Sequence, residues 1–128
     1  MCVRGASALG QLLKKKPNKE AMLFVVWEPI VEADVGPPPG DVLALLDDPR
    51  TIQFWDANRL LSAQMVHDLR AHPDWLRPGD QVIDGHVVWD FVAVYDPGAT
   101  WQSETPRPIY YSNPLVAGIA ELQRLIGD

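Results

Sequence analysis

Residues 22–28, Met-Leu-Phe-Val-Val-Trp-Glu, form a continuous apolar run that Pro29 closes. The run lacks the alternation of polar and apolar residues that marks a strand with one solvated face. Continuous runs of this kind are typical of strands in parallel sheets, which are covered on both faces. The segment therefore predicts a buried strand within an α/β fold.

Four other segments carry the periodicity or the end signals of helices. They are residues 3–16; 41–46, capped by Asp41; about 57–70, capped by Asp56; and a final helix capped by Asn113, with Pro114 first and Gly127 at its end. In two of them the apolar residues share one face, and these residues are Val3, Ala6, Leu9 and Leu13, and Leu61, Met65 and Leu69.

Two more strands are predicted, one at residues 51–55 and a stronger one at residues 86–95. A turn at 96–98 and a short return strand at 100–102 make residues 86–102 a hairpin. The order of elements favours a mainly parallel sheet with a C-terminal antiparallel hairpin and helices on both faces. The length of 128 residues suits a single domain, residues 1–128, with the proline-rich segment 36–40 as a surface loop.

Charge and hydropathy exclude several classes of partner. The formal net charge of −6 argues against nucleic acid and against anionic membranes. The one basic cluster is short and predicts a solvated helix end: Lys14, Lys15, Lys16 and Lys19. No segment approaches the ~20 apolar residues of a membrane span or the pattern of a signal peptide. We therefore expect a cytoplasmic protein, exported only if the natural gene product is longer.

The sulfur and imidazole groups do not predict a metal site. Cys2 is the single cysteine, which excludes an intrachain disulfide and a cysteine-based zinc site. His67 and His72 are five residues apart, a spacing that turns them off a common helical face, and these two histidines and His86 are interpreted as surface and turn residues. No phosphate-loop, dinucleotide or nucleophile-elbow motif is present, so no cofactor is predicted.

Carboxylates follow or interrupt the predicted strands. Glu28, Glu32 and Asp34 follow the first strand, Asp56 follows the second, and Asp90 interrupts the third. A catalytic pair would need two such groups at strand ends in one cleft. The alternative is that these residues are helix caps and a hydrogen-bonded structural aspartate.

Aromatic side chains are numerous, with five tryptophans in the chain. They form either core packing or an aromatic binding surface. The residues concerned are Trp27, Trp55, Trp89, Trp101, Tyr110 and Tyr111.

The order of elements, with a hairpin before the last helix, resembles the thioredoxin fold. Within it, the segments 48–62 and 91–98 look like the inserted strand and helix and the penultimate strand of the branch shared by peroxiredoxins and TlpA-type thiol-disulfide oxidoreductases. Residues 2–6, Cys-Val-Arg-Gly-Ala, resemble the second half of that family's Cys-x-x-Cys motif. The resemblance implies that the attacking cysteine and the first central strand lie upstream of Met1. It departs from the family at Val87 and Val88, where a cis-proline is usual.

A missing central strand would leave the strands at 22–28 and 86–95 with unpaired edges, and each buried unpaired backbone group costs about 1–3 kcal/mol. Three outcomes are open. The two strands pair directly, which is our first expectation; a strand from another chain fills the gap, as in a homodimer through the unpaired central edge; or the natural protein is longer.

Three functions follow from these considerations. The resemblance implies a thiol-disulfide oxidoreductase in which Cys2 is the catalytic resolving thiol and a protein thiol or disulfide is the partner, inactive without the upstream cysteine. The second is a non-catalytic binding module that uses the aromatic and acidic loops near 28–40 and 104–113. The third is a thiolate binder of a soft metal such as mercury or copper(I).

Overall fold

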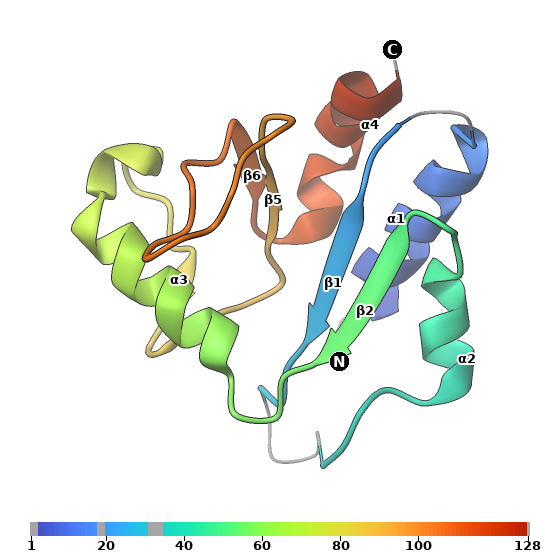
Figure 1. Cartoon of the computed structure of the whole chain (residues 1–128), viewed down its shortest axis with the longest axis horizontal. Coiled ribbons are helices and arrows are strands. Elements are labelled where there is room, and N and C mark those ends of the chain that lie inside the picture. Colours follow the sequence, from blue (N-terminus) through green and yellow to red (C-terminus); the bar gives the residue numbers. More distant parts are fainter. Residues whose placement is uncertain (1–2, 18–19, 31–34, 128) are drawn as a thin grey trace.

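The computed structural model of the chain describes residues 3–17, 20–30 and 35–127, and in these ranges it is an α/β structure (Figure 1). Its α-helices are α1 (Val3–Lys15), α2 (Gly40–Leu43), α3 (Leu60–Ala71) and α4 (Ile119–Gly127). Short 3₁₀ helices are η1 (Ala44–Leu46), η2 (Pro73–Trp75) and η3 (Leu115–Gly118). No helix in the described ranges is long and apolar enough to cross a membrane.

Six described strands form three separate pairs. Strands β1 (Leu23–Trp27) and β2 (Thr51–Trp55) are parallel; β3 (Ile83–Asp84) with β4 (Val87–Val88), and β5 (Val92–Val94) with β6 (Tyr110–Ser112), are antiparallel. The predicted strands at 22–28 and 51–55 are therefore confirmed. The mainly parallel sheet is not, because one pair of the three is parallel.

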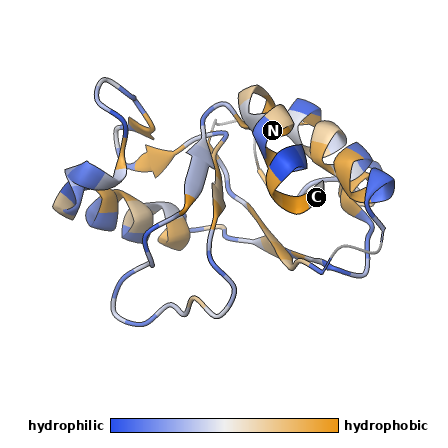
Figure 2. Cartoon of the chain, turned by 90° about the horizontal axis from the view of Figure 1, so that it is seen from above, coloured by the Kyte–Doolittle hydropathy of each residue, from blue (hydrophilic) through white to orange (hydrophobic). Residues whose placement is uncertain are grey.

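A first hydrophobic core lies between the β1–β2 sheet and helices α1 and α4. Ala6, Leu9 and Leu13 of α1 are buried in it, as the helical periodicity predicts, whereas Val3 is 43% exposed. The other buried residues of this core are Leu12 of α1, Trp27 of β1, Leu46 of η1 and Leu122 of α4. In Figure 2 the hydrophobic residues of these helices and strands face one another across it.

Close packing fixes α1 in place at two points. A Cβ atom on Gly10 would lie 2.0 Å from the backbone oxygen of Leu45, so α1 approaches η1 closer than any side chain allows. At the end of α1, the guanidinium of Arg50 donates to the carbonyl oxygens of Leu13 at 2.9 Å and Lys16 at 2.7 Å. Asp48 holds that guanidinium, and the hydrogen bonds from Arg50 lower the pKa of Asp48 to about 2.

A second core lies between α3 and the β5–β6 pair. It contains Met65, Val66 and Leu69 of α3, with Val88 and Tyr111. Successive residues of β5 face different cores: Val92 and Val94 pack on the first core and Ala93 on the second. The β5–β6 pair is therefore a wall shared by both cores, with helices on both of its faces.

The predicted strand at residues 86–95 is wrong in its length. The chain breaks at Asp90, whose φ of 49° is left-handed and ends the extended run, so that β4 and β5 belong to different pairs. The predicted turn at 96–98 forms, since the amide of Ala99 donates to the Asp96 oxygen at 3.0 Å. The predicted return strand at 100–102 does not form, because β5 pairs with β6 instead.

Three predicted helix starts also differ. The final helix begins as η3 after Pro114, and the side chain of Asn113 donates to the carbonyl oxygen of Trp89 instead of capping a helix. Asp41 lies in the first turn of α2, because Pro39 occupies the capping position. Arg59, not Asp56, occupies the N-cap position of α3, but the Asp56 carboxylate does contact the first turn of that helix, where it accepts the amide of Leu61 at 2.8 Å.

Direct pairing of the strands at 22–28 and 86–95, our first expectation, is wrong. Among the described residues β1 pairs only with β2, and β5 only with β6, although β5 runs beside β1 in Figure 1. The amide of Leu23 donates to the Arg50 oxygen at 2.9 Å and that of Asp56 to the Trp27 oxygen at 2.8 Å. In a parallel ladder this places the backbone groups of Phe24 and Val26 at the opposite, open edge of β1.

Candidate functional site

The face of the β1–β2 sheet opposite the helices is uncovered in the described part of the chain. Alternate residues point to it: Phe24 and Val26 of β1, and their register partners Ile52 and Phe54 of β2. Phe24 is 61% exposed, Ile52 43% and Phe54 49%. We call this surface, with the 60% exposed Met22 that precedes β1, the open face.

The open face contradicts the expectation that both faces of the first strand are covered. Parallel sheets are normally covered on both sides because their strands carry apolar residues on both sides. Here the sequence supplies the apolar side chains, but in the described ranges no helix packs on them. An exposed apolar surface of this kind is a candidate interaction site.

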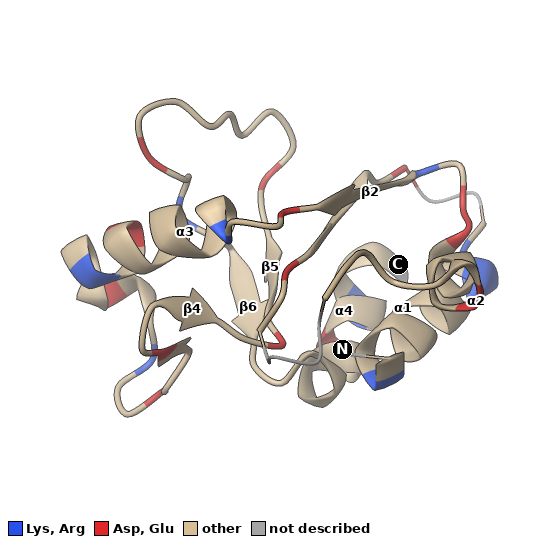
Figure 3. Cartoon of the chain, turned by 90° about the horizontal axis from the view of Figure 1, so that it is seen from below, with Lys and Arg blue, Asp and Glu red and all other residues tan. Residues whose placement is uncertain are grey.

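A pair of carboxyl groups lies at one end of the open face, where β1 and β2 both terminate. Glu28 follows β1 and Asp56 follows β2, so the parallel arrangement brings them to the same edge, which is acidic in Figure 3. The carboxylate of Glu28 accepts the Ser62 hydroxyl and, at 3.1 Å, the Ser62 amide. Both carboxyl groups thus lie at the start of α3.

The two carboxyl groups differ in proton affinity. Burial raises the pKa of Glu28, and the adjacent negative charge of Asp56 raises it further, against the Ser62 hydrogen bonds that lower it. Burial also opposes ionisation of Asp56, but backbone amides at the start of α3 outweigh it and lower the pKa of that carboxyl group. Asp56 therefore loses its proton more readily than Glu28 as pH rises.

The sequence allows a pair of acids at the ends of two strands, and the structure contains one such pair. Glu28 and Asp56 are two acids at strand ends brought together, whereas Glu32 and Asp34 lie outside the described residues. Asp90 is not an interruption within a strand, and its carboxylate accepts the amide of Leu115 at 3.3 Å.

Ser62 is the residue of this group that sequence reasoning missed. It is 2% exposed, and its hydroxyl oxygen also accepts the amide of Val88 at 3.3 Å. A serine in the first turn of a helix is ordinary in sequence, so no signal marks it as a partner of Glu28.

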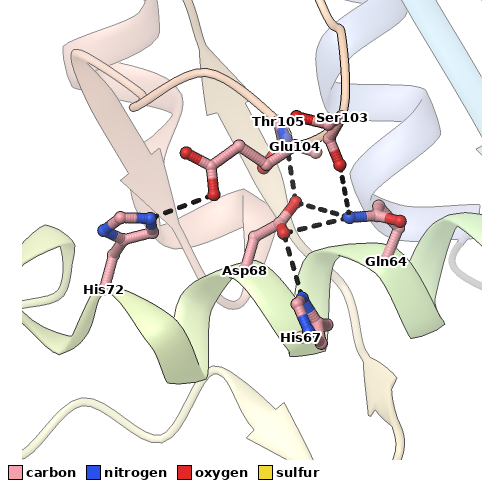
Figure 4. Close-up of polar contacts among 7 residues, drawn as sticks. All are labelled: Gln64, His67, Asp68, His72, Ser103, Glu104 and Thr105. Atoms are coloured by element: carbon pink, nitrogen blue, oxygen red, sulfur yellow. Dashed lines mark hydrogen bonds and ion pairs between the residues drawn. The ribbon is translucent and has the colours of Figure 1, made fainter.

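A separate buried carboxylate anchors the long loop between β5 and β6 to α3 (Figure 4). Asp68 is 0% exposed and accepts the amide of Thr105 at 2.8 Å and the side-chain amide of Gln64 at 3.0 Å. His72 and Glu104 form a second link at 3.1 Å. Burial would raise the pKa of Asp68, but the donors from Thr105, Gln64 and His67 outweigh it and lower that pKa. The arrangement holds a loop and leaves the carboxylate without access to solvent.

A hollow of about 650 Å³ lies beside η2 and the following turn. It is open and is lined by Leu69, Arg70, Leu76, Arg77, Asp80 and Ile83, among others. Its polar groups serve one another: Arg77 contacts Asp80 at 2.8 Å and lies 4.2 Å from the centre of the Tyr111 ring, and the Tyr111 hydroxyl donates to Asp80. The charged and hydroxyl groups of Arg77, Asp80 and Tyr111 in this hollow are therefore engaged with one another.

The histidines and the cysteine singled out in the sequence do not form a site in the described part of the chain. Cys2 lies outside the described residues. His67 lies beside Asp68 and His72 pairs with Glu104, and the described residues contain no cluster of three metal-ligating groups.

The aromatic residues are divided between core and surface. Trp27 and Tyr111 are buried, whereas Trp89 is 54% exposed and Trp101 is 49% exposed. The aromatic residues singled out in the sequence are therefore not all on one surface. Tyr95 packs edge-on against Trp101, with ring centres 6.2 Å apart, and burial together with the charge of Asp68 raises its pKa to about 12.

Comparison of the chain with family models, with curated proteins and with solved structures finds no match. The function is therefore argued from the geometry of the open face.

Proposed function

We propose that this chain is an interaction module that binds another protein on the open face of the β1–β2 sheet. The observation that carries the proposal is the exposure of Phe24, Ile52 and Phe54 on one contiguous face, each between 43% and 61%. This is the non-catalytic function predicted from the sequence, moved from the loops to the sheet.

The energetics support a binding role for this surface. Full burial of one phenylalanine or isoleucine side chain contributes about 1.5–3 kcal/mol. Covering the exposed parts of Phe24, Ile52 and Phe54 therefore contributes about 2–5 kcal/mol to the binding of a partner segment. Left in water, the same surface promotes non-specific association, which a monomeric protein has reason to avoid.

We further propose that the fold is thioredoxin-like without its first central strand. The separation of the layer into the β1–β2 and β5–β6 pairs, and the open edge of β1 at Phe24 and Val26, support this assignment. Pairing of two copies through that edge, and a thiol role for Cys2 with a disulfide partner or a soft metal, stay predictions.

The proposed function is tested by selection from a displayed library of peptides of about 16 residues. The library is selected on the wild-type protein and counter-selected on the Phe24→Ser/Phe54→Ser double variant. We expect enriched peptides that lose at least about 100-fold in affinity for the double variant, since two aromatic contacts are removed.

The matched control is Val35→Ser, because Val35 is 93% exposed and lies outside the sheet. This variant keeps wild-type affinity, and circular dichroism establishes that all three proteins are equally folded. Failure to enrich any peptide that depends on Phe24 and Phe54 overturns the proposed function.

An insulin-reduction assay separates this function from thiol chemistry. The wild type and a Cys2→Ser variant are expected to be equally inactive, because dithiol exchange needs a second cysteine. Activity that disappears in the Cys2→Ser variant contradicts the non-catalytic assignment.

A further inference from the structure

We infer that the occupant of the open face is an amphipathic helix of a different protein, with a Lys or Arg near the end that lies over Glu28 and Asp56. The inference rests on the proposed function and specifies the partner that the open face accepts.

The direction of the exposed side chains favours a helix over an added strand. Phe24, Ile52 and Phe54 point out of the face of the sheet, so only an element lying on that face covers them. A strand added at the open edge of β1 would satisfy the backbone hydrogen bonds of Phe24 and Val26 but leave the three exposed side chains in water.

The dimensions also suit a helix. Two strands of five residues extend about 17 Å, a length matched by a helix of about 11 residues, or three turns. Helices are the elements that cover the faces of parallel sheets, and α1 already occupies this position on the opposite face. A helix of three turns offers three or four apolar side chains, comparable with the apolar residues of the open face.

Charge selects the sequence of the helix and argues against a second copy of this chain. The open face ends at the carboxyl groups of Glu28 and Asp56, which follow β1 and β2, and the hydrogen bond from the Leu61 amide favours the ionised form of Asp56. A Lys or Arg placed there forms a charge-assisted contact in a partly desolvated position. A second copy would instead bring together two chains that each carry a net charge of −6.

The experiment uses the peptides enriched on the open face, synthesised in pairs that differ only in Lys or Glu at the terminal position nearest Glu28 and Asp56. Affinity for the full chain is measured by fluorescence anisotropy at pH 7. We expect the Lys peptide to bind about 10-fold more tightly than the Glu peptide. In the Glu28→Gln/Asp56→Asn variant the ratio is expected to fall to about 2-fold or less.

The matched control for charge is Glu20→Gln, which precedes β1 at the other end of the sheet and leaves the preference unchanged. Binding of the peptide is expected to raise its helical circular dichroism. Equal affinity of the Lys and Glu peptides, or bound peptides without helix, overturns this inference while the dependence on Phe24 and Phe54 still supports the proposed function. Sedimentation of the free protein as a dimer that Phe24→Ser/Phe54→Ser dissociates also overturns it, because the occupant is then a second copy.

Discussion

Buried carboxyl groups illustrate how much single residues add beyond the hydrophobic pattern. The role of Asp56 at the start of α3 is predictable because an aspartate before an apolar helix accepts the free amides of its first turn. Asp68 is not predictable in this way, since it lies among polar residues in the middle of α3 and its partner Thr105 is 37 residues distant. Local sequence thus identifies acids that serve their own helix and misses acids that hold a distant loop.

Replacement of Asp68 by Asn is expected to destabilise the protein by about 2–3 kcal/mol at pH 7, because a charged acceptor of several buried hydrogen bonds is lost. The measurement is urea unfolding, with Asp74→Asn at an exposed site as the control.

The stability that Asp68 contributes should depend on pH. The pKa of Asp68 is lower in the folded chain, so its contribution is present above the unfolded pKa of about 4 and is lost as pH falls through the folded pKa. The difference between wild type and Asp68→Asn should therefore shrink below pH 4. A difference that stays constant from pH 7 to pH 3 contradicts the ionised anchor.

Removal of the Ser62 hydroxyl is expected to raise the pKa of Glu28 further, because this donor stabilises the carboxylate form. Carbon-13 NMR titration of the Glu28 carboxyl group in Ser62→Ala measures the shift, with Ser103→Ala as the control. The same variant should lose about 1–3 kcal/mol of stability, since the Val88 amide also loses its acceptor. An unchanged Glu28 titration would falsify the assigned hydrogen bond.

Among the elements, those defined by periodicity or by uniform apolar composition are predicted best. Helices α1 and α3 and strands β1 and β2 lie close to the expected positions. The segment 86–95 shows the limit of this approach, because seven of its ten residues favour a strand and yet Asp90 adopts a left-handed conformation. The path of this segment is decided by its contacts with residues 110–115, and strand propensity, which describes single residues, takes no account of such contacts.

The contact between α1 and η1 depends on the absence of a side chain at Gly10. We expect Gly10→Ala to destabilise the protein by about 3 kcal/mol, because its Cβ would overlap the Leu45 backbone oxygen, which moves only with η1. Gly40→Ala is the matched control, since a Cβ there has open space, and its stability should change by less than about 0.5 kcal/mol. Thermal unfolding measures both, and equal stability of the two variants would show that η1 adapts.

At the scale of the whole molecule, the shared wall couples the two hydrophobic cores. Val92 and Val94 belong to one core and Ala93 to the other, so neither core can lose the β5–β6 pair alone. The sequence indicated an α/β chain with alternating elements, but the division into three strand pairs arises from pairings between distant segments. The open face could not be predicted from the sequence either, because residues 22–28 have the composition of a strand that is covered on both sides.

We expect the two cores to unfold together in one cooperative transition. Leu12→Ala in the first core should lower the free energy of unfolding by about 2–5 kcal/mol, and Val66→Ala in the second core by about 1–3 kcal/mol. Each variant should shift the midpoint of the entire transition. Coincident denaturation curves from tryptophan fluorescence and far-ultraviolet circular dichroism are the measurement. Separate transitions in either variant would contradict the coupling through β5 and β6.

The edge of β1 opposite β2, which pairs with no strand in the described ranges, has a practical consequence for handling the protein. Residues 23–27 contain no proline, lysine or other charged residue that would discourage the growth of intermolecular β-structure. Concentrated samples should consequently age by slow formation of thioflavin-positive fibrils, seeded at this strand. A lysine in place of Val26 would act as a gatekeeper and lengthen the shelf life of the preparation.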